Sequence, residues 1–212
     1  MSKERFYTVA EERWNVITHG IGFIVAIFAS IILLNKGLQQ GIHLQFISYL
    51  IYCFGLVTLY LASTLYHSAK VPELKRRLNI FDHSAIYVLI AGTYTPIALL
   101  AIEGTWGLVI FCIIWILAAV GIIMKHYFIG RYSKISTATY VLMGWVIVIA
   151  IKPLINSMVT SGLLWLLAGG IFYTLGALLY QKKSIKYSHA IFHIFVLLGS
   201  ICHYIVVLNY TN

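Results

Sequence analysis

The sequence predicts an all-α integral membrane protein, a bundle of seven transmembrane helices, and two observations carry this prediction. Of the 212 residues, 61% are apolar and only 10% are charged, whereas a soluble domain is about 45–50% apolar and about 25% charged. So few charged side chains cannot cover a surface that faces water, so most of the exterior must face lipid. The apolar residues also fall into separate runs, each about long enough to cross a membrane. Because backbone groups in lipid have no water to bond, these runs are expected to be helices.

The runs define seven spans within one domain. A helix that crosses the hydrocarbon core needs roughly 20 mostly apolar residues. The connections between the runs are short, and we find no linker, low-complexity tract or internal repeat, so residues 1–212 are expected to form a single membrane domain. The expected spans are 16–35, 44–66, 80–101, 106–124, 137–155, 162–180 and 189–209.

The net charge of +9 lies in the connections between spans, a pattern typical of membrane orientation that argues against a nucleic-acid partner. By the positive-inside rule the basic side is cytoplasmic, which places the N-terminus in the cytoplasm and, after an odd number of spans, the C-terminus outside. The basic residues beside His126 are expected to be interface anchors. Only Lys36 and Lys152 fall on the outer side; the basic residues of the cytoplasmic side are Lys3, Arg5, Arg13, Lys70, Lys75, Arg76, Arg77, Lys125, Arg131, Lys134, Lys182, Lys183 and Lys186.

Three classes of protein are excluded by these patterns. The predicted orientation is opposite to that of G-protein-coupled receptors. A retinal Schiff base needs a lysine inside a helix, and the expected span 189–209 has none. A disulfide framework or a thiolate metal site is also excluded, because Cys53, Cys112 and Cys202 lie inside apolar runs with no CxxC pair and are expected to be packing residues.

Ionisable side chains inside the spans are few, and such residues are costly in lipid and functional by default. The direction of each helix fixes the depth of each group. His67 ends a span that runs toward the cytoplasm, whereas Asp82, His189 and His193 lie in the first turns of spans that run outward. Four groups from three helices therefore meet at one depth near the cytoplasmic face.

The spacing of these residues predicts a zinc site. His189 and His193 are four residues apart, so both imidazoles project from one helix face, as two zinc ligands would. His67 is a third candidate ligand, with the hydroxyl of Ser63 one turn before it. Three histidines and an open fourth position are typical of catalytic zinc, although each histidine taken alone is as well explained as an interfacial residue. Asp82 is either a fourth ligand or, as we favour, a general base or orienting residue that bonds a water on the metal.

The remaining polar residues of the spans lead to separate expectations. His19 either caps the first helix or forms part of the site wall. His83 follows Asp82 and points about 100° away around the helix, so it is expected to face away from the site. His203, about 15 Å deeper, is expected to form a hydrogen bond within the bundle. Pro96 is expected to kink its helix because it lacks a backbone donor.

Four motifs, taken together and in this order, resemble the bacterial haemolysin III branch of the progestin and adiponectin receptor (PAQR) family. The resemblance covers essentially the whole chain and implies the same inverted topology that the charges predict. The motifs are ERWNVITHG from Glu12, STLYH from Ser63 to His67, FDHS from Phe81 to Ser84, and HAIFH from His189 to His193.

The resemblance implies a set of roles for particular residues. Zinc would be held by His67, His189 and His193. Asp82 would act on the metal-bound water, and Ser63 would line the site. The protein would be a multi-pass protein of the bacterial plasma membrane.

The function expected from these features is zinc-dependent hydrolysis of a lipid, at an amide bond. The wider superfamily includes alkaline ceramidases, whose motif pattern this chain resembles, and a site at inner-leaflet depth suits a lipid substrate or ligand in the bilayer. One alternative is a membrane sensor or receptor-like protein in which zinc is structural. Another is a haemolysin-type cytolysin, although a pore needs polar groups along its whole path and the outer half of this bundle offers little beyond His203.

The orientation can be tested with reporter fusions. We expect fusions after Lys36, Glu103, Ser157 and Asn212 to report the outer side of the membrane, because each follows an outward-running span. Fusions after Lys75, Arg131 and Lys183 should report the cytoplasm. A single reporter on the wrong side would contradict the predicted orientation.

Overall fold

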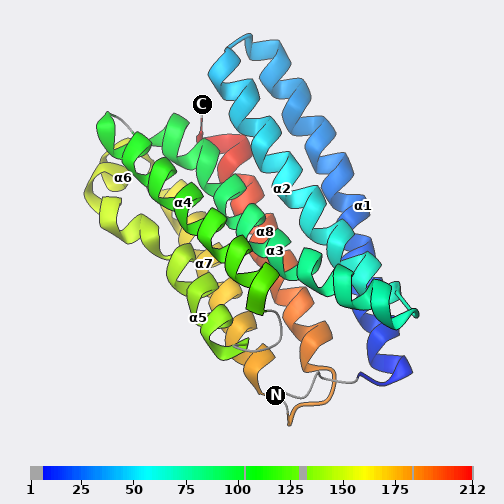
Figure 1. The fold of residues 1–212 in the computed structure, drawn as a ribbon. Helices are drawn as coiled ribbons and strands as arrows, with labels where there is room; N and C mark the ends of the chain where they lie inside the picture. Colours follow the sequence, from blue (N-terminus) through cyan, green and yellow to red (C-terminus); the bar gives the residue numbers. More distant parts are fainter. Residues whose placement is uncertain (1–6, 103, 129–132, 183, 212) are drawn as a thin grey trace.

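The computed structural model describes residues 7–102, 104–128, 133–182 and 184–211, and within these ranges the chain folds into helices alone (Figure 1). Seven helical segments are long and apolar enough to cross a membrane, which confirms the seven predicted spans. Their elements are α1 (Val9–Gln40), α2 (His43–Ser68), α3 (Pro72–Pro96) with the π-helix η1 (Ile97–Ala101), α4 (Thr105–Phe128), α5 (Ser133–Gly144) with the 3₁₀-helix η2 (Val146–Ala150) and α6 (Ile151–Ser157), α7 (Thr160–Gln181) and α8 (Ser188–Tyr210).

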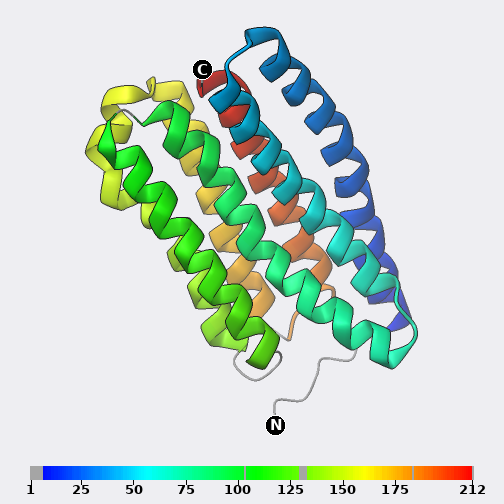
Figure 2. The same cartoon turned by 45° about the horizontal axis from the view of Figure 1, so that its top comes forward.

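The helices run past the apolar cores from which they were predicted. The first is the clearest case, since α1 has 32 residues where the apolar run covers 16–35. Helix α1 begins and helix α8 ends at opposite ends of the bundle (Figures 1 and 2). The added turn at the start of α1 is polar, and it supplies part of the site described below.

The start of α1 is held by a capping box. Thr8 is the N-cap: its hydroxyl accepts a hydrogen bond from the Glu11 amide at 3.2 Å, and its own amide donates to Glu11 Oε2 at 2.9 Å. These reciprocal bonds satisfy amide donors that the first turn of a helix leaves without partners. The cap thereby fixes the positions of Tyr7 and Glu12, which flank it.

Helices α2 and α3 approach each other closely through small residues. A Cβ on Gly55 would lie 2.9 Å from the carbonyl oxygen of Val88, and one on Gly92 would lie 3.1 Å from that of Ile51. Such contacts are typical of helix packing inside membranes, where small residues let backbones come together. The result is that the first half of α2 and the second half of α3 stand side by side.

Pro96 changes the hydrogen bonding of the third span. The α-helix ends at Pro96, and the chain continues as the π-helix η1, whose last residue is Ala101. A proline has no amide to donate and its ring crowds the preceding turn, so the ladder shifts its register there. The sequence predicted a disruption at this residue, and the structure shows its form.

The fifth span contains a break that the sequence did not predict. Helix α5 ends at Gly144 and gives way to a 3₁₀ turn from Val146. The hydroxyl of Tyr94 repairs the break, because it donates to the Gly144 carbonyl at 2.7 Å and accepts from the Ile147 amide at 2.9 Å. Backbone groups freed in a membrane helix need such a partner.

The outward surface is apolar, as a lipid-facing surface must be. Ile24, Phe28, Phe54, Ile116 and Leu164 are each more than half exposed. Helices so covered with apolar side chains are those of a multi-pass membrane protein, in agreement with the expected location.

The three cysteines are free thiols. Cys53 and Cys202 are buried, as expected for packing residues, while Cys112 is exposed on α4. Cys112 was also expected to be a packing residue, but its thiol faces outward from the bundle.

Candidate metal centre

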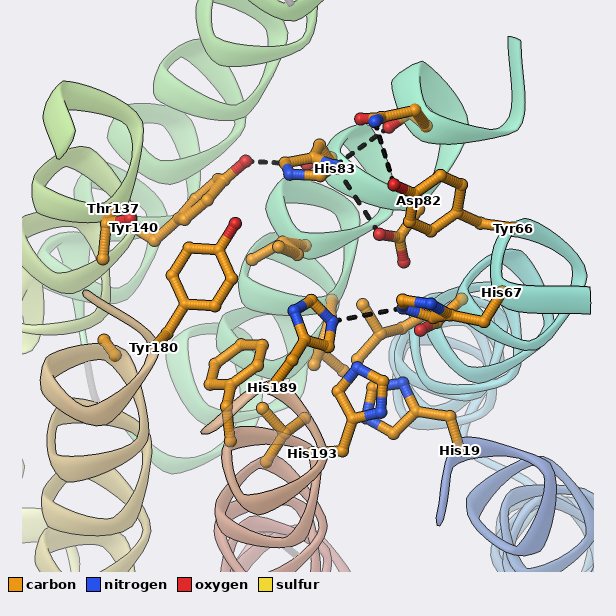
Figure 3. Close-up of a pocket in the computed structure, with 18 of the residues that line it drawn as sticks. His19, Tyr66, His67, Asp82, His83, Thr137, Tyr140, Tyr180, His189 and His193 are labelled. Carbon is orange, nitrogen blue, oxygen red and sulfur yellow. Dashed lines mark hydrogen bonds and ion pairs between the residues drawn. The ribbon is translucent and has the colours of Figure 1, made fainter. Parts of the chain in front are cut away.

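Three histidines meet inside the bundle. His67 comes from the last turn of α2, and His189 and His193 come from the first two turns of α8; all three are buried. One ring nitrogen from each lies within 4.8 Å of the others, and Nε2 of His67 is 3.1 Å from Nε2 of His189 (Figure 3). The prediction that these three residues come together is confirmed.

The outer nitrogen of His67 faces a carboxylate. Its Nδ1 lies 2.6 Å from Oε2 of Glu12, and the other carboxylate oxygen of Glu12 accepts from Lys75 Nζ at 2.5 Å. Since a carboxylate is an acceptor only, Nδ1 of His67 carries the proton. The lone pair of this imidazole is therefore on Nε2, which points to the other histidines.

In His189 and His193, too, the ring nitrogen that points away from the cluster, Nδ1, faces a residue near the N-terminus. The hydroxyl of Thr18 donates to the Trp14 carbonyl at 2.8 Å and lies 3.0 Å from Nδ1 of His193. Because the Thr18 hydroxyl has one proton and donates it to the Trp14 carbonyl, it accepts in its contact with His193, and Nδ1 of His193 is the donor. Nδ1 of His189 lies 2.7 Å from the hydroxyl of Tyr7.

The donor set fits a metal such as zinc. Three neutral imidazoles with their lone pairs on converging nitrogens are the ligands of a catalytic zinc site. In metal sites the other ring nitrogen of a ligating histidine almost always donates to a carboxylate, hydroxyl or carbonyl, which fixes the tautomer. His67, His189 and His193 have such partners in Glu12 and in two hydroxyls, all from residues 7–18.

Asp82 and Ser63, the predicted catalytic pair, lie beside the cluster. Asp82 is only 7% exposed, and its Oδ2 lies 3.5 Å from Nδ1 of His83, but it is not one of the three residues whose ligand atoms converge. In Figure 3 its carboxylate lies between His83 and the ring of His67. Ser63 is 1% exposed, and its hydroxyl has no well-aligned hydrogen bond among the described residues.

His19 belongs to the site wall. Its ring stacks on that of His193 with 3.4 Å between centroids, and both of its nitrogens are buried without a hydrogen-bond partner in the described part of the chain. The cap of α1 is Thr8, not His19. Of the two possibilities left by the sequence, the structure supports the second.

The prediction for His83 was wrong. It was expected to face away from the site, yet it lines the same cavity as Asp82. The rotation of about 100° between neighbouring residues is correct, but the cavity is wide enough to contact both faces of α3. His203 agrees with its prediction, since its Nε2 donates to the Leu166 carbonyl at 3.1 Å.

A cavity of about 1120 Å³ joins these groups. It reaches from the three histidines past Asp82 to Tyr140 on α5, to Trp145 at the break after α5, and to His203 on α8. Lys125 also lines it and is 5% exposed. The sequence had counted this lysine among the interface anchors, and the structure corrects that assignment.

The contacts of Glu12 and Asn15 on α1 with the histidines were not predicted from the sequence. Glu12, Asn15 and His19 are spaced three and four residues apart, so they share one helix face, and all three face the cluster or line the cavity. This spacing of polar residues at the start of an apolar helix was a readable signal. It could not show which neighbouring helix that face would contact.

Comparison with known proteins agrees with the motif resemblance. The model of the family described as Haemolysin-III related matches residues 7–204. The chain is 45% identical over 202 residues to Hemolysin-3 of Bacillus cereus, covering 95% of this chain and 92% of that protein. It is 44% identical to a Hemolysin-3 homolog of Bacillus subtilis, covering 96% of each. It is also 29% identical to the human Monocyte to macrophage differentiation factor, covering 96% of this chain and 85% of that protein.

The metal site can be tested by removing ligands. Purified protein should contain about one zinc per chain, and His67→Ala or His193→Ala should lose most of it, because two imidazoles hold zinc much less tightly than three. Thermal stability should fall with the metal, since binding to the folded state is linked to folding. His203→Ala, whose imidazole bonds a backbone carbonyl, should keep its zinc. Unchanged zinc content in both ligand variants would remove the basis for the site.

The contribution of α1 can be tested at Glu12. We expect Glu12→Gln to weaken zinc binding roughly 10–100-fold, the usual cost of removing the partner of a ligating histidine. Competition with a chelator of known affinity would measure it. Glu11→Gln is the matched control, since it removes the same charge one residue away and an amide side chain preserves the capping box. Equal zinc affinities in the two variants would contradict the assigned role of Glu12.

Proposed function

The chain belongs to the haemolysin-III-related family, and we propose that this member is a zinc-dependent membrane hydrolase that cleaves an amide bond in a lipid. One observation carries the proposal. A buried carboxylate and a hydroxyl lie beside three converging imidazole nitrogens, and all of them line one cavity within membrane-crossing helices. This combination of groups is what hydrolysis requires.

His67, His189 and His193 would hold the metal. Their donor atoms are all nitrogen, which favours zinc and related transition metals over magnesium or calcium, whose ligands are oxygen. Zinc bound there supplies Lewis acidity, which polarises a carbonyl group and makes water more acidic. The protein's own part is to hold the rings of His67 and His193 in one tautomer, which residues 7–18 of the chain do.

Asp82 is the general base of the proposal. Its carboxylate takes a proton from the attacking water as the new C–O bond forms, and returns it to the amide nitrogen as the C–N bond breaks. The products are a fatty acid and an amine. A base outside the ligand set suits this role, because its lone pairs are not committed to the metal. Asp82 is close to the cluster and is not part of it.

Ser63 would orient the substrate. Its hydroxyl is buried near the Asp82 carboxylate without a well-aligned hydrogen bond among the described residues, and a buried polar group in that state is costly unless a ligand or water completes its bonding. It lies one helical turn from His67 on α2. From there the hydroxyl can donate to the carbonyl oxygen of the scissile amide as negative charge develops on it.

The cavity accounts for the lipid part of the substrate. Its volume of about 1120 Å³ is somewhat above that of most ligand sites, which are roughly 300–1,000 Å³. Ile86, Leu89, Ile90, Phe192 and Val196 contribute apolar side chains to its wall. A site of this size between membrane helices suits a substrate with a long acyl chain.

A sensor with structural zinc is the second candidate, and one observation favours it. Glu12 joins α1 to His67 of α2 and to Lys75 of α3, so the same contacts that orient a ligand also fasten three helices together. The name Hemolysin-3 of the Bacillus cereus relative suggests cytolysis as a third candidate. Lysis of erythrocytes by the purified protein would test that candidate directly.

Asp82 separates the enzyme from the sensor. Asp82→Asn should keep its zinc and its fold, because the amide is nearly isosteric, but it cannot take a proton at neutral pH. Turnover of N-acyl lipids such as ceramide should fall roughly 10²–10⁴-fold, the usual contribution of a general base. Fatty acid release by the purified protein, with and without chelator, would measure it, and Glu11→Gln is the charge-matched control.

Two results would contradict this reading. Loss of zinc together with activity in Asp82→Asn would make Asp82 a ligand rather than the base. Wild-type protein that holds zinc yet releases nothing from a broad panel of N-acyl lipids would favour the sensor.

A further inference from the structure

The side chain of Lys125 points in a direction that is unusual for a lysine near the end of a membrane helix. It lies in the last turn of α4, where a lysine usually extends its ammonium to the lipid headgroups. Its neighbours Met124, His126 and Tyr127 are exposed, but Lys125 is only 5% exposed and faces the cavity. The side chain therefore points inward although an outward path begins one residue away.

The ammonium of Lys125 is attracted by the carboxylate of Asp82 across the cavity, but within the described residues no carboxylate touches it. Its Nζ lies over an aromatic face, 5.6 Å from the centroid of the Tyr140 ring. Asp82 lines the same cavity, but no ion pair joins the two: the carboxylate of Asp82 has His83 as its close neighbour, at 3.5 Å. A buried charge is costly unless it is paired. Within the described residues the position in contact with the ammonium is thus open to the anionic group of a ligand.

The surroundings of Lys125 define one end of the cavity. Tyr140 holds its place through a hydrogen bond from its hydroxyl to the His83 carbonyl at 3.0 Å. Figure 3 shows His83 and Tyr140 on the far side of Asp82 from His193. Lys125 is therefore the buried cation on one side of Asp82, with the histidines on the other side. The other basic residues that line the cavity lie on α1, on α3 and between α2 and α3: Arg13, Lys70, Lys75 and Arg76.

We propose that Lys125, with His83 and Tyr140 as its wall, binds the anionic headgroup of an amphiphilic substrate. The inference rests on the proposed function and names its substrate class, an N-acyl lipid whose amine portion carries a carboxylate or a phosphate. The ammonium pairs with that anion, and the amide then lies toward Asp82 and the histidines. The acyl chain occupies the apolar remainder of the cavity.

A matched pair of ligands tests the proposal by binding. N-oleoylglycine and N-oleoylethanolamine share the chain and the amide, and differ in a carboxylate against a hydroxyl. Full-length wild-type protein in neutral detergent should bind N-oleoylglycine about 10-fold or more tightly than N-oleoylethanolamine, which corresponds to one charge-assisted contact of about 1.4 kcal/mol. Competition against a fluorescent fatty acid would measure both affinities. Inorganic phosphate and acetate should not compete at the same concentrations, which separates a headgroup from a free anion.

Variants locate the effect. Lys125→Gln should reduce the preference to about 2-fold or less, while Lys125→Arg should keep it. Lys134→Gln is the matched control: it removes the same charge from an exposed lysine at the start of α5 that does not line the cavity. If Lys125→Gln does not fold, the proposal is still tested by the preference of the wild-type protein and by its retention in Lys125→Arg and Lys134→Gln. Equal wild-type affinities for the two ligands, or equal losses in Lys125→Gln and Lys134→Gln, would overturn the proposal.

Fatty acid release from the same two ligands separates this inference from the proposed function. Selective binding of N-oleoylglycine without hydrolysis of either ligand would support the anion site and overturn the proposed hydrolase activity. Hydrolysis of both with equal kcat/KM and equal affinity would leave the hydrolase and overturn the anion site.

Discussion

The structure depends on one interaction, the contact between the start of the chain and the three clustered histidines, whose ring nitrogens are buried on both sides. Three histidines from α2 and α8 present one nitrogen each to a common point. Their other nitrogens are satisfied by Tyr7, Glu12 and Thr18, all at the start of α1. An unsatisfied polar group in this setting costs about 1–3 kcal/mol. The position of α1 and the tautomers of His67 and His193 are therefore set by the same bonds.

This interaction links the start of the chain to the chemistry. The capping box at Thr8 fixes the first turn of α1, and the same turn carries Glu12. Glu12 in turn contacts His67 on α2 and Lys75 on α3, the helix that also carries Asp82. The proposed base and the ligand set are thus positioned by one connected group of charges. The end of the bundle that carries the three histidines is also the end at which Glu12 fastens three helices together.

The sequence predicted the parts of the fold that lipid imposes. Seven apolar runs gave seven helices because the bilayer requires a minimum apolar length from each. The break after Gly144 was not predicted, because it depends on a hydroxyl from another helix, that of Tyr94, which accepts and donates where the ladder stops. A partner 50 residues away in the chain leaves no local pattern.

The site was predicted to a similar extent and for a similar reason. The four-residue spacing of His189 and His193, and the shared depth of His67, were sufficient to predict the cluster. Helical periodicity gives the direction of a side chain around its own helix, but not which neighbour lies there. The predictions for His83 and Lys125 were therefore wrong. His83 was expected to face away from the site, and Lys125 was expected to be an interface anchor.

Lys125 shows that a single cation can serve two purposes. The positive-inside rule depends on the number of basic residues near the ends of spans, not on where their side chains finally point. A lysine that contributes to orientation during insertion can therefore turn into the bundle once the helices pack. Inside, its charge is screened less than at the surface, so its attraction for an anion is stronger. The cavity then combines polar groups at the histidines, Asp82 and Lys125 with apolar side chains from α2, α3 and α8. In the proposed complex such a distribution would hold a ligand by its headgroup and set how far the amide lies from the histidines.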